Sequence, residues 1–80
     1  MKNWTVYILN CNDGTYYVGC TSNLDDRISK HEKGYVKSTK NRIPVTVSTT
    51  IVFTDKYKAF EFEKYLKTSS GRAFMNKRLI

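Results

Sequence analysis

A turn signal between two β-rich segments constrains this chain more than any other feature of its sequence. The segments WTVYILN (residues 4–10) and TYYVG (15–19) are rich in β-branched and aromatic residues, which favour strands. Between them stands Asn12-Asp13-Gly14, a combination that is typical of tight hairpin turns. The sequence therefore predicts a β-hairpin over residues 4–19.

The register of this hairpin decides whether Tyr7 and Tyr17 share a face of the sheet. A two-residue loop of Asp13 and Gly14 pairs residues whose numbers sum to 27, and the two tyrosines then point to opposite faces. A three-residue loop with Gly14 in the left-handed conformation pairs residues whose numbers sum to 26. In that register Tyr7 and Tyr17 share one face, and Gly19 leaves open space beside Tyr7. The local sequence is compatible with both registers.

Residues 21–34 (TSNLDDRISKHEKG) predict the first helix. Ser22 is the expected N-cap, because its hydroxyl can accept a hydrogen bond from a free backbone N–H group of the first turn. Leu24 and Ile28 form one apolar ridge, and Gly34 is the expected stop.

The remaining segments predict one strand and two further helices. Residues 45–53 (VTVSTTIVF) favour a strand, and residues 54–68 favour a helix capped by Thr54 or Asp55. Residues 69–80 favour a short helix, or a turn followed by a helix. We therefore expect one domain over residues 1–80 with an α+β fold, in which a three-stranded antiparallel sheet is flanked by helices in the order β-β-α-β-α-α.

The charge balance favours a polyanionic partner. The chain has 14 Lys and Arg against 7 Asp and Glu, which leaves a net charge of +7. A basic surface neutralises phosphates and releases counterions, so log K for DNA should fall linearly with log salt, with a slope near about −0.9 per phosphate neutralised. On composition alone, a basic but otherwise ordinary soluble surface is an equally good explanation. The candidate nucleic-acid-binding residues are Lys37, Lys40 and Arg42 in the basic segment 35–44, and Lys77 and Arg78 near the C-terminus.

The two cysteines indicate a reducing compartment. Cys11 and Cys20 are too few for a disulfide framework or a four-ligand zinc site, and neither register places them opposite each other. We therefore expect two free thiols. No apolar run approaches the ~18 residues of a membrane span, and the N-terminal segment lacks the small-residue cleavage site of a signal peptide. These features predict a cytoplasmic protein without a membrane partner.

Arg27 and His31 are the first candidates for chemistry. They are spaced i, i+4 on the first predicted helix, so they stack on one of its faces. This pair suits a site that binds a phosphate and moves a proton. The simpler alternative is a solvated helix face that carries two basic residues.

Glu63 is the candidate carboxylate of the second predicted helix. Ala59, Phe62 and Leu66 define the expected core-facing stripe, and Glu63 lies about 40° from Ala59 at its margin, whereas Glu61 points to solvent. A carboxylate at the margin of a core needs a partner, because burying an unpaired charge is costly. An arginine, a metal ion or an ordinary salt bridge would serve.

The joint spacing of these residues resembles that of the GIY-YIG nuclease domain. The segments VYI (6–8) and YVG (17–19) match the family's two tyrosine motifs, and they are followed by Arg27, His31 and a later glutamate. Tyr7 and Tyr17 are ten residues apart, Tyr17 and Arg27 ten, and Arg27 and His31 four. The resemblance covers nearly all of the chain, and its C-terminal part is similar to small stand-alone bacterial members.

The resemblance implies a metal-dependent DNA endonuclease that serves DNA repair or recombination, like the N-terminal nuclease domain of the excision-repair nuclease. It implies that Glu63 binds one Mg²⁺ or Mn²⁺ ion. The substrate would be DNA held through its backbone with little sequence specificity, and a protein partner would supply the targeting. The catalytic residues that the resemblance implies are Tyr7, Tyr17, Arg27, His31 and Glu63. Because such a site needs both tyrosines on one face, we predict the register that sums to 26.

The sequence also departs from the family's pattern. Thr5 replaces the glycine of the first motif, and Cys20 stands where repair nucleases of the family often have a lysine. Asn76 lies near the place of an asparagine that some members use for catalysis. One alternative is therefore a nucleic-acid-binding module that has the same fold without the chemistry. Another is a protein-interaction domain with no affinity for nucleic acid.

Overall fold

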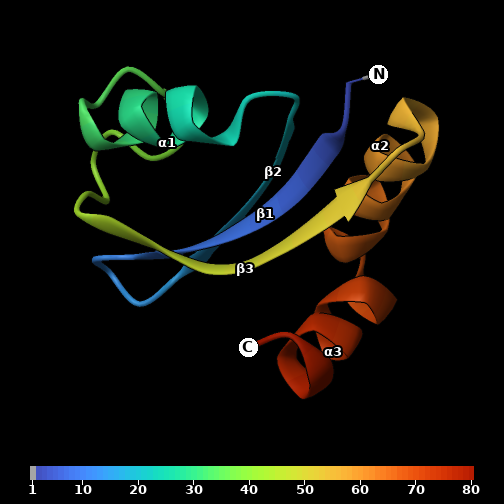
Figure 1. The fold of residues 1–80 in the computed structure, drawn as a ribbon. Helices are drawn as coiled ribbons and strands as arrows, with labels where there is room; N and C mark the ends of the chain where they lie inside the picture. The colour runs from blue at the N-terminus through green and yellow to red at the C-terminus, as the bar shows by residue number, and fades with distance from the viewer. Residues whose placement is uncertain (1) are drawn as a thin grey trace.

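The computed structural model describes residues 2–80 and has the element order predicted from the sequence. The strands form one antiparallel sheet in the order β2-β1-β3, with the N-terminal strand in the centre. The predicted α+β fold is therefore confirmed (Figure 1). The elements are β1 (Trp4–Cys11), β2 (Tyr16–Thr21), α1 (Leu24–Glu32), β3 (Val45–Phe53), α2 (Lys56–Leu66) and α3 (Ser69–Arg78).

Gly14 sets the register of the β1–β2 hairpin. Its φ angle is 83°, in the left-handed region that glycine adopts without strain. Its N–H group donates to the Cys11 carbonyl at 3.0 Å, and the Cys11 N–H donates to the Thr15 carbonyl at 2.8 Å. The loop therefore has three residues, and Tyr7 pairs with Gly19 in the register that sums to 26. The prediction that Tyr7 and Tyr17 share a face is confirmed, and their ring centroids are 6.3 Å apart.

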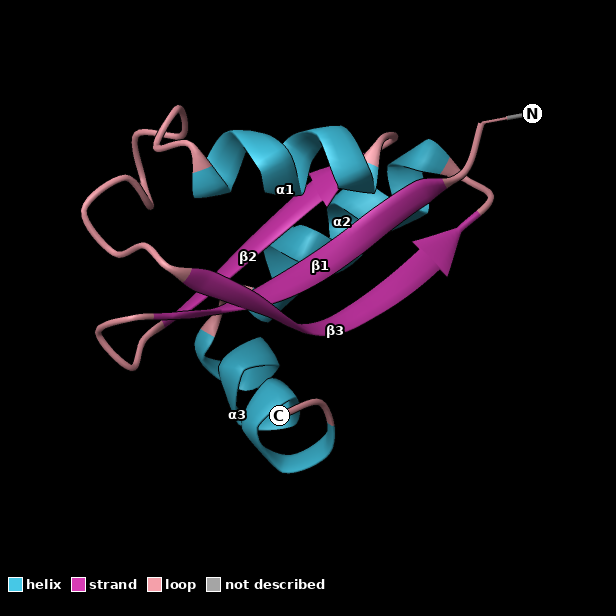
Figure 2. Ribbon diagram, turned by 60° about the vertical axis from the view of Figure 1, so that its left-hand side comes forward, coloured by secondary structure: helices cyan, strands magenta, loops and turns pink. Residues whose placement is uncertain are grey.

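Alternation along β1 divides its side chains between two faces that different helices cover. Figure 2 shows α1 on one side of the sheet and α2 on the other. Under α2 and α3, the core consists of apolar residues: Val6, Ile8, Val18, Ala59, Leu66 and Met75. Under α1, the buried residues include Tyr7, Leu9, Cys11 and Val45, against which Tyr17, Leu24 and Ile28 pack. The predicted ridge of Leu24 and Ile28 therefore faces the sheet.

The first helix starts one residue later than predicted and stops where predicted. The prediction of Ser22 as the N-cap is wrong: the side chain of Asn23 accepts the Asp26 N–H at 3.1 Å. Thr21 accepts the Asn23 N–H at 3.1 Å, which fixes Asn23 in an extended conformation at the cap position. Gly34 ends the helix at a φ of 77°, and its N–H donates to the His31 carbonyl at 3.0 Å.

At the start of α2 and of α3, the structure selects one of the two alternatives predicted from the sequence. Asp55 rather than Thr54 caps α2, and α3 begins directly at Ser69. The predicted core stripe of α2 is confirmed, because Ala59 and Leu66 are fully buried and Phe62 packs against the same core. No helix within residues 2–80 is long and apolar enough to cross a membrane.

The two cysteines lie on opposite faces of the sheet. Cys11 belongs to the cluster under α1, whereas Cys20 packs against the core under α2 and α3. Both are free thiols, as predicted. Burial, and after it the charge of Glu63, raises the pKa of the Cys20 thiol, so Cys20 has no thiolate character at neutral pH.

Candidate active site

Tyr7 is the centre of a buried hydrogen-bonded group beneath α1. The residue is fully buried, and its hydroxyl oxygen lies 2.9 Å from Nε2 of His31. The same oxygen accepts a long hydrogen bond of 3.4 Å from Nε of Arg27. The end of the ring lies over Gly19, where a Cβ atom would occupy the space of the hydroxyl. A glycine at position 19 is therefore a steric requirement of the Tyr7 ring.

His31 is fully buried, so the alternative of a solvated face for Arg27 and His31 is wrong. Its ring packs edge-on against Tyr7 and Tyr17, with centroid distances of 5.7 and 5.1 Å. Its second ring nitrogen, Nδ1, lies 2.7 Å from the hydroxyl oxygen of Thr39. Both nitrogens of the imidazole therefore have protein partners.

Thr39 is the residue of this group that sequence reasoning missed. It is fully buried although it lies between exposed residues of the loop 35–44. A single hydroxyl in an irregular basic segment carries no periodic signal. Its spacing of eight residues from His31 would place the two together only if the loop folds back over α1.

Burial and the Arg27 charge set the protonation of the group. Burial raises the pKa of the Tyr7 hydroxyl, and the hydrogen bond from Arg27 opposes this. Burial, with the Arg27 charge second, lowers the pKa of His31 below its usual value of 6.5. The hydrogen bond to Tyr7 raises the pKa of Arg27. Near pH 7 the group therefore consists of a neutral phenol, a neutral imidazole and a guanidinium cation.

Glu63 lies on α2 at the margin of the core, as the helical wheel predicts. Its side chain is 19% exposed, and its carboxylate lies 3.5 Å from Nζ of Lys67, which is 50% exposed. Burial does most to raise the pKa of Tyr7, and the charges of Tyr17 and then Glu63 raise it further, against the lowering effect of Arg27. The Tyr7 side chain lies on the other face of the sheet from Cys20. The carboxylate is thus within electrostatic reach of both faces. Glu61 is exposed, as predicted.

A divalent ion at Glu63 would have one carboxylate ligand. Within residues 2–80, no three His, Cys, Asp or Glu side chains are grouped closely enough to hold a metal ion. Mg²⁺ commonly binds through one or two carboxylates while it keeps several waters and contacts substrate phosphates. The partly exposed Glu63 fits that kind of site and does not fit an all-protein cage.

A groove of about 430 Å³ follows the outer edge of β2 beside α2 and α3. Tyr17 borders it, but the groove lies on the α2 and α3 side of the sheet, and Tyr7, Arg27 and His31 do not line it. Lys67, the ion-pair partner of Glu63, also borders it. Arg72 and Asn76 of α3 line its other side. No sequence pattern pointed to Lys67 or Arg72, which meet beside β2 only because the end of α2 and the helix α3 pack there.

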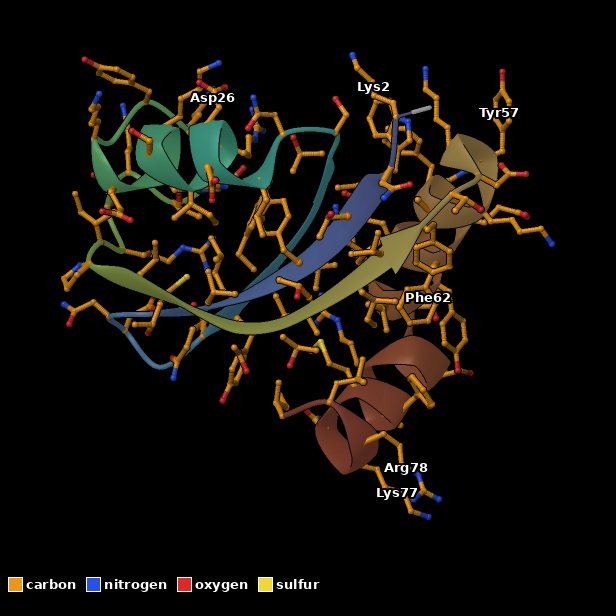
Figure 3. All side chains as sticks on the ribbon, in the orientation of Figure 1. Lys2, Asp26, Tyr57, Phe62, Lys77 and Arg78 are labelled. Carbon is orange, nitrogen blue, oxygen red and sulfur yellow. The ribbon has the colours of Figure 1, made fainter. Side chains whose placement is uncertain are left out.

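The predicted nucleic-acid-binding residues lie in separate places. Lys37 and Lys40 are exposed in the loop 35–44. The Arg42 guanidinium donates to the Ser38 carbonyl at 2.6 and 3.1 Å and to the Thr15 hydroxyl at 2.8 Å, which ties this loop to the hairpin turn. Lys77 and Arg78 point outward from the end of α3, far from α1 (Figure 3). The structure does not bring these five residues together.

A comparison with protein families identifies the class to which this fold and site belong. The model described as the GIY-YIG catalytic domain matches residues 3–78. The chain therefore belongs to the GIY-YIG family. This is a family of nuclease domains, which act on DNA and generally use divalent metal ions.

The chain is similar to small proteins of the UPF0213 group. The UPF0213 protein BH0048 of Halalkalibacterium halodurans is 41% identical over 71 residues, which cover 88% of this chain and 76% of that protein. A UPF0213 protein of Halobacterium salinarum is 39% identical over 66 residues, which cover 81% and 86%. The solution NMR structure of BH0048 matches with a TM-score of 0.60 at 35% identity, over 94% of this chain and 83% of that chain. These names state no activity, so they support the fold and the family only.

Proposed function

We propose that this protein is an endonuclease that hydrolyses DNA phosphodiester bonds with Mg²⁺ or Mn²⁺. The observation that carries the proposal is the buried contact of Tyr7 with both His31 and Arg27. A guanidinium, a phenol and an imidazole held together are suited to phosphate binding and proton transfer. Buried polar groups are costly unless they are paired, and nothing in the packing of a small core requires a phenol and an imidazole to be buried together.

Each side chain has one role in the proposed reaction. Arg27 neutralises the charge that develops on the scissile phosphate. Tyr7 takes the proton of the attacking water after its own hydroxyl proton has left to solvent, and His31 is its hydrogen-bonding partner. Tyr17, whose ring packs against those of Tyr7 and His31, orients them.

Glu63 is the proposed metal ligand. When bound there, the ion would supply Lewis-acid stabilisation of the phosphate and of the leaving oxygen. Lys67 pairs with Glu63 across a solvent-exposed contact, which is weak enough for a cation to displace.

The groove along β2 offers the DNA backbone a basic surface on the α2 and α3 side of the sheet. Lys67 and Arg72 line it, together with Tyr17, whose ring packs against His31. Non-specific backbone contacts need only such cations. Lys37 and Lys40 in the loop, and Lys77 and Arg78 on α3, would extend the contact to the DNA beyond the groove. Sequence specificity and targeting would then come from a protein partner.

The second candidate is a DNA-binding module of the same fold that no longer cleaves. The observation in its favour is Cys20, which stands where the family's repair nucleases often have a lysine. The Cys20 side chain faces the apolar core under α2 and supplies no charge to the site.

A pair of glutamate variants tests the proposal. We predict that Glu63→Gln lowers the rate of nicking of supercoiled or branched DNA at least about a hundredfold, because a neutral amide is a poor ligand for a hard cation. Folding should persist, and DNA binding measured in EDTA should be unchanged or stronger, because a negative charge is removed beside the phosphate. Glu61→Gln is the matched control: it removes the same charge from an exposed position two residues away and should change little.

Each outcome of this experiment decides between the candidates. Equal cleavage by the wild-type protein and Glu63→Gln would refute the metal assignment. If the wild-type protein cleaves no form of DNA with either metal but binds DNA in a salt-dependent way, the binding module is correct. If it does not bind DNA at low salt, both candidates are wrong.

A further inference from the structure

The hydroxyl of Thr39 lies at the closed end of the buried hydrogen-bonded chain that runs through His31 to Tyr7. The distances along the chain are 2.7 Å from Thr39 Oγ1 to Nδ1 of His31, and 2.9 Å from Nε2 to the Tyr7 hydroxyl. All three residues are fully buried. His31 is neutral, so its ring carries one hydrogen, and that hydrogen lies on one of the two nitrogens.

The direction of the hydrogen bonds follows from counting hydrogens. The Thr39 hydroxyl, the neutral imidazole and the Tyr7 hydroxyl have one hydrogen each, but the chain has only two contacts. One hydrogen must therefore point out of the chain, at the Thr39 end or at the Tyr7 end. The position of the imidazole hydrogen decides which end.

The Thr39 end offers no acceptor for such a hydrogen. Within residues 2–80, the Thr39 hydroxyl makes no hydrogen bond except the one to His31, and no water reaches its surface. If Nδ1 carried the hydrogen, the Thr39 hydrogen would be buried without a partner, which is the costly arrangement. If Thr39 donates to Nδ1 instead, its hydrogen is satisfied and the imidazole hydrogen lies on Nε2.

The Tyr7 end lies beside two side chains that are partly exposed. The Tyr7 hydroxyl lies against Arg27 and near Tyr17, both of which are partly exposed, and Tyr17 borders the groove. With the hydrogen on Nε2, the Tyr7 oxygen accepts from both His31 and Arg27. The Tyr7 hydroxyl is as fully buried as that of Thr39, so its hydrogen is left for a water or a phosphate oxygen that reaches it when the partly exposed side chain of Arg27 or Tyr17 moves aside.

We propose that Thr39 is a positioning residue, which donates to Nδ1 of His31 and thereby holds the imidazole as an Nε2–H donor to Tyr7. In this arrangement His31 is not the final proton acceptor. Nε2 already carries a hydrogen, so His31 donates to the Tyr7 oxygen together with Arg27 and does not take the Tyr7 proton. These two donors favour the phenolate, which forms when the hydroxyl proton leaves to solvent and which then takes the proton of the attacking water. This assignment of roles rests on the proposed nuclease function, whereas the hydrogen-bond directions do not.

Nitrogen NMR of the imidazole tests the directions without any activity assay. His31 is the only histidine in the chain, so an untagged, ¹⁵N-labelled protein gives one pair of ring-nitrogen signals. We expect Nε2 to carry the hydrogen in the wild-type protein at pH 7.5, and Nδ1 to be an unprotonated nitrogen with a hydrogen-bond shift. A hydrogen on Nδ1 would overturn the proposal.

Two variants of Thr39 test its positioning role. Thr39→Val keeps the shape and removes the hydroxyl, so the Nδ1 signal should move to the position of a nitrogen without a hydrogen bond. In a cleaving protein, kcat should fall about tenfold with KM unchanged, which is the effect of one lost hydrogen bond. Thr39→Ser keeps the hydroxyl and should restore both the Nδ1 signal and kcat to within about twofold.

Matched controls separate this proposal from the failure of the proposed function. Ser38→Ala removes an exposed hydroxyl from the neighbouring position and should leave the Nδ1 signal and kcat unchanged. If Thr39→Val does not fold, the wild-type and Thr39→Ser spectra still decide the hydrogen positions. If the wild-type protein does not cleave DNA, the proposed function fails, while the Nδ1 signals of the variants still confirm or refute the contact. An unchanged Nδ1 signal in a folded Thr39→Val protein would refute it.

Discussion

The two faces of β1 are equally buried but are held in different ways. Val6 and Ile8 on the α2 side are 1% exposed, and Tyr7 and Leu9 on the α1 side are 0% exposed. The first pair belongs to a cluster of apolar side chains. On the second face, Tyr7 belongs to a chain of hydrogen bonds with His31, Thr39 and Arg27. Burial therefore does not distinguish the stabilising face from the candidate site, whereas the hydrogen bonds do.

The two faces should therefore differ in how well they tolerate substitutions. An apolar face tolerates changes that conserve volume, because dispersion and hydrophobic contacts have little direction. A buried polar chain tolerates few changes, because each member depends on the position of the next. The glycines of the two faces let this comparison be tested, since each glycine makes room for a close approach. Gly71 does so for the α2–α3 contact, and Gly19 does so for Tyr7.

The largest effect is expected from Gly71→Ala on the apolar side. The added Cβ would collide with the carbonyl of Tyr65 and with Cα of Leu66, which are backbone atoms and cannot move aside cheaply. We expect a loss of about 3 kcal/mol in the free energy of unfolding, or roughly 15 °C in Tm for a domain of this size. Chemical denaturation measures it.

Gly34→Ala is the control for this variant. Its Cβ would meet nothing within 4 Å, so only the strain of its φ of 77° remains, at about 1 kcal/mol. If Gly71→Ala costs no more than Gly34→Ala, the close contact of α2 with α3 does not stabilise the protein.

On the polar side, Gly19→Ala is expected to cost less stability than Gly71→Ala but to lower the nicking rate strongly. Its Cβ would collide with the ring and hydroxyl of Tyr7, a side chain that can be displaced at lower cost than the backbone atoms met at Gly71, so the stability loss should be smaller, at about 1–2 kcal/mol. The hydroxyl would, however, leave His31 and Arg27. We therefore expect the nicking rate to fall by about two orders of magnitude while the protein stays folded.

A Tyr7→Phe background sharpens this prediction. If Gly19→Ala acts through the Tyr7 hydroxyl, it should cost little further activity in a protein that already lacks this hydroxyl. Additive losses in the double variant would instead indicate that Gly19 contacts the DNA directly.

Local composition, a turn signal and the helical wheel predicted the fold and part of the site. β-branched and aromatic residues identified the strands, and the helical wheel placed Glu63 at the core margin and Glu61 in solvent, as the structure has them. The hairpin register could not be predicted from the local sequence, because a two-residue and a three-residue loop are both compatible with Asn12-Asp13-Gly14. The family's pairing of tyrosines selected the three-residue loop, which is the one observed.

Contacts made by residues of an irregular loop could not be predicted, because such residues follow no repeating pattern. Thr39 and Arg42 lie in the same irregular loop, and the basic composition indicated only a surface for DNA. In the structure Thr39 is buried against His31, and Arg42 ties the loop to Thr15 and Ser38. Such contacts depend on how a loop closes over a helix, which neither residue encodes locally. The misplaced cap has a simpler cause: Ser22 and Asn23 are adjacent, and both residue types are good N-caps.

The smallest expected effect is an acid-side loss of stability that belongs to the polar face alone. Burial lowers the pKa of His31 in the folded protein below the 6.5 of an unfolded chain. Between these values the unfolded chain binds a proton that the folded protein does not, so the free energy of unfolding must fall as the pH falls. Above pH 7 both states are neutral at this position, and the contribution is constant. For one proton, the slope of the free energy of unfolding against pH cannot exceed about 1.4 kcal/mol per pH unit. The slope should develop between pH 7 and pH 5.5, before the carboxylates titrate.

A histidine variant tests this expectation. Because His31 is the only histidine, His31→Gln should flatten the curve of unfolding free energy against pH in this window, whatever its effect on stability at pH 7.5. Parallel curves for the two proteins would mean that His31 is protonated as readily in the fold as in the unfolded chain, and that the face under α1 is wetter than its burial indicates.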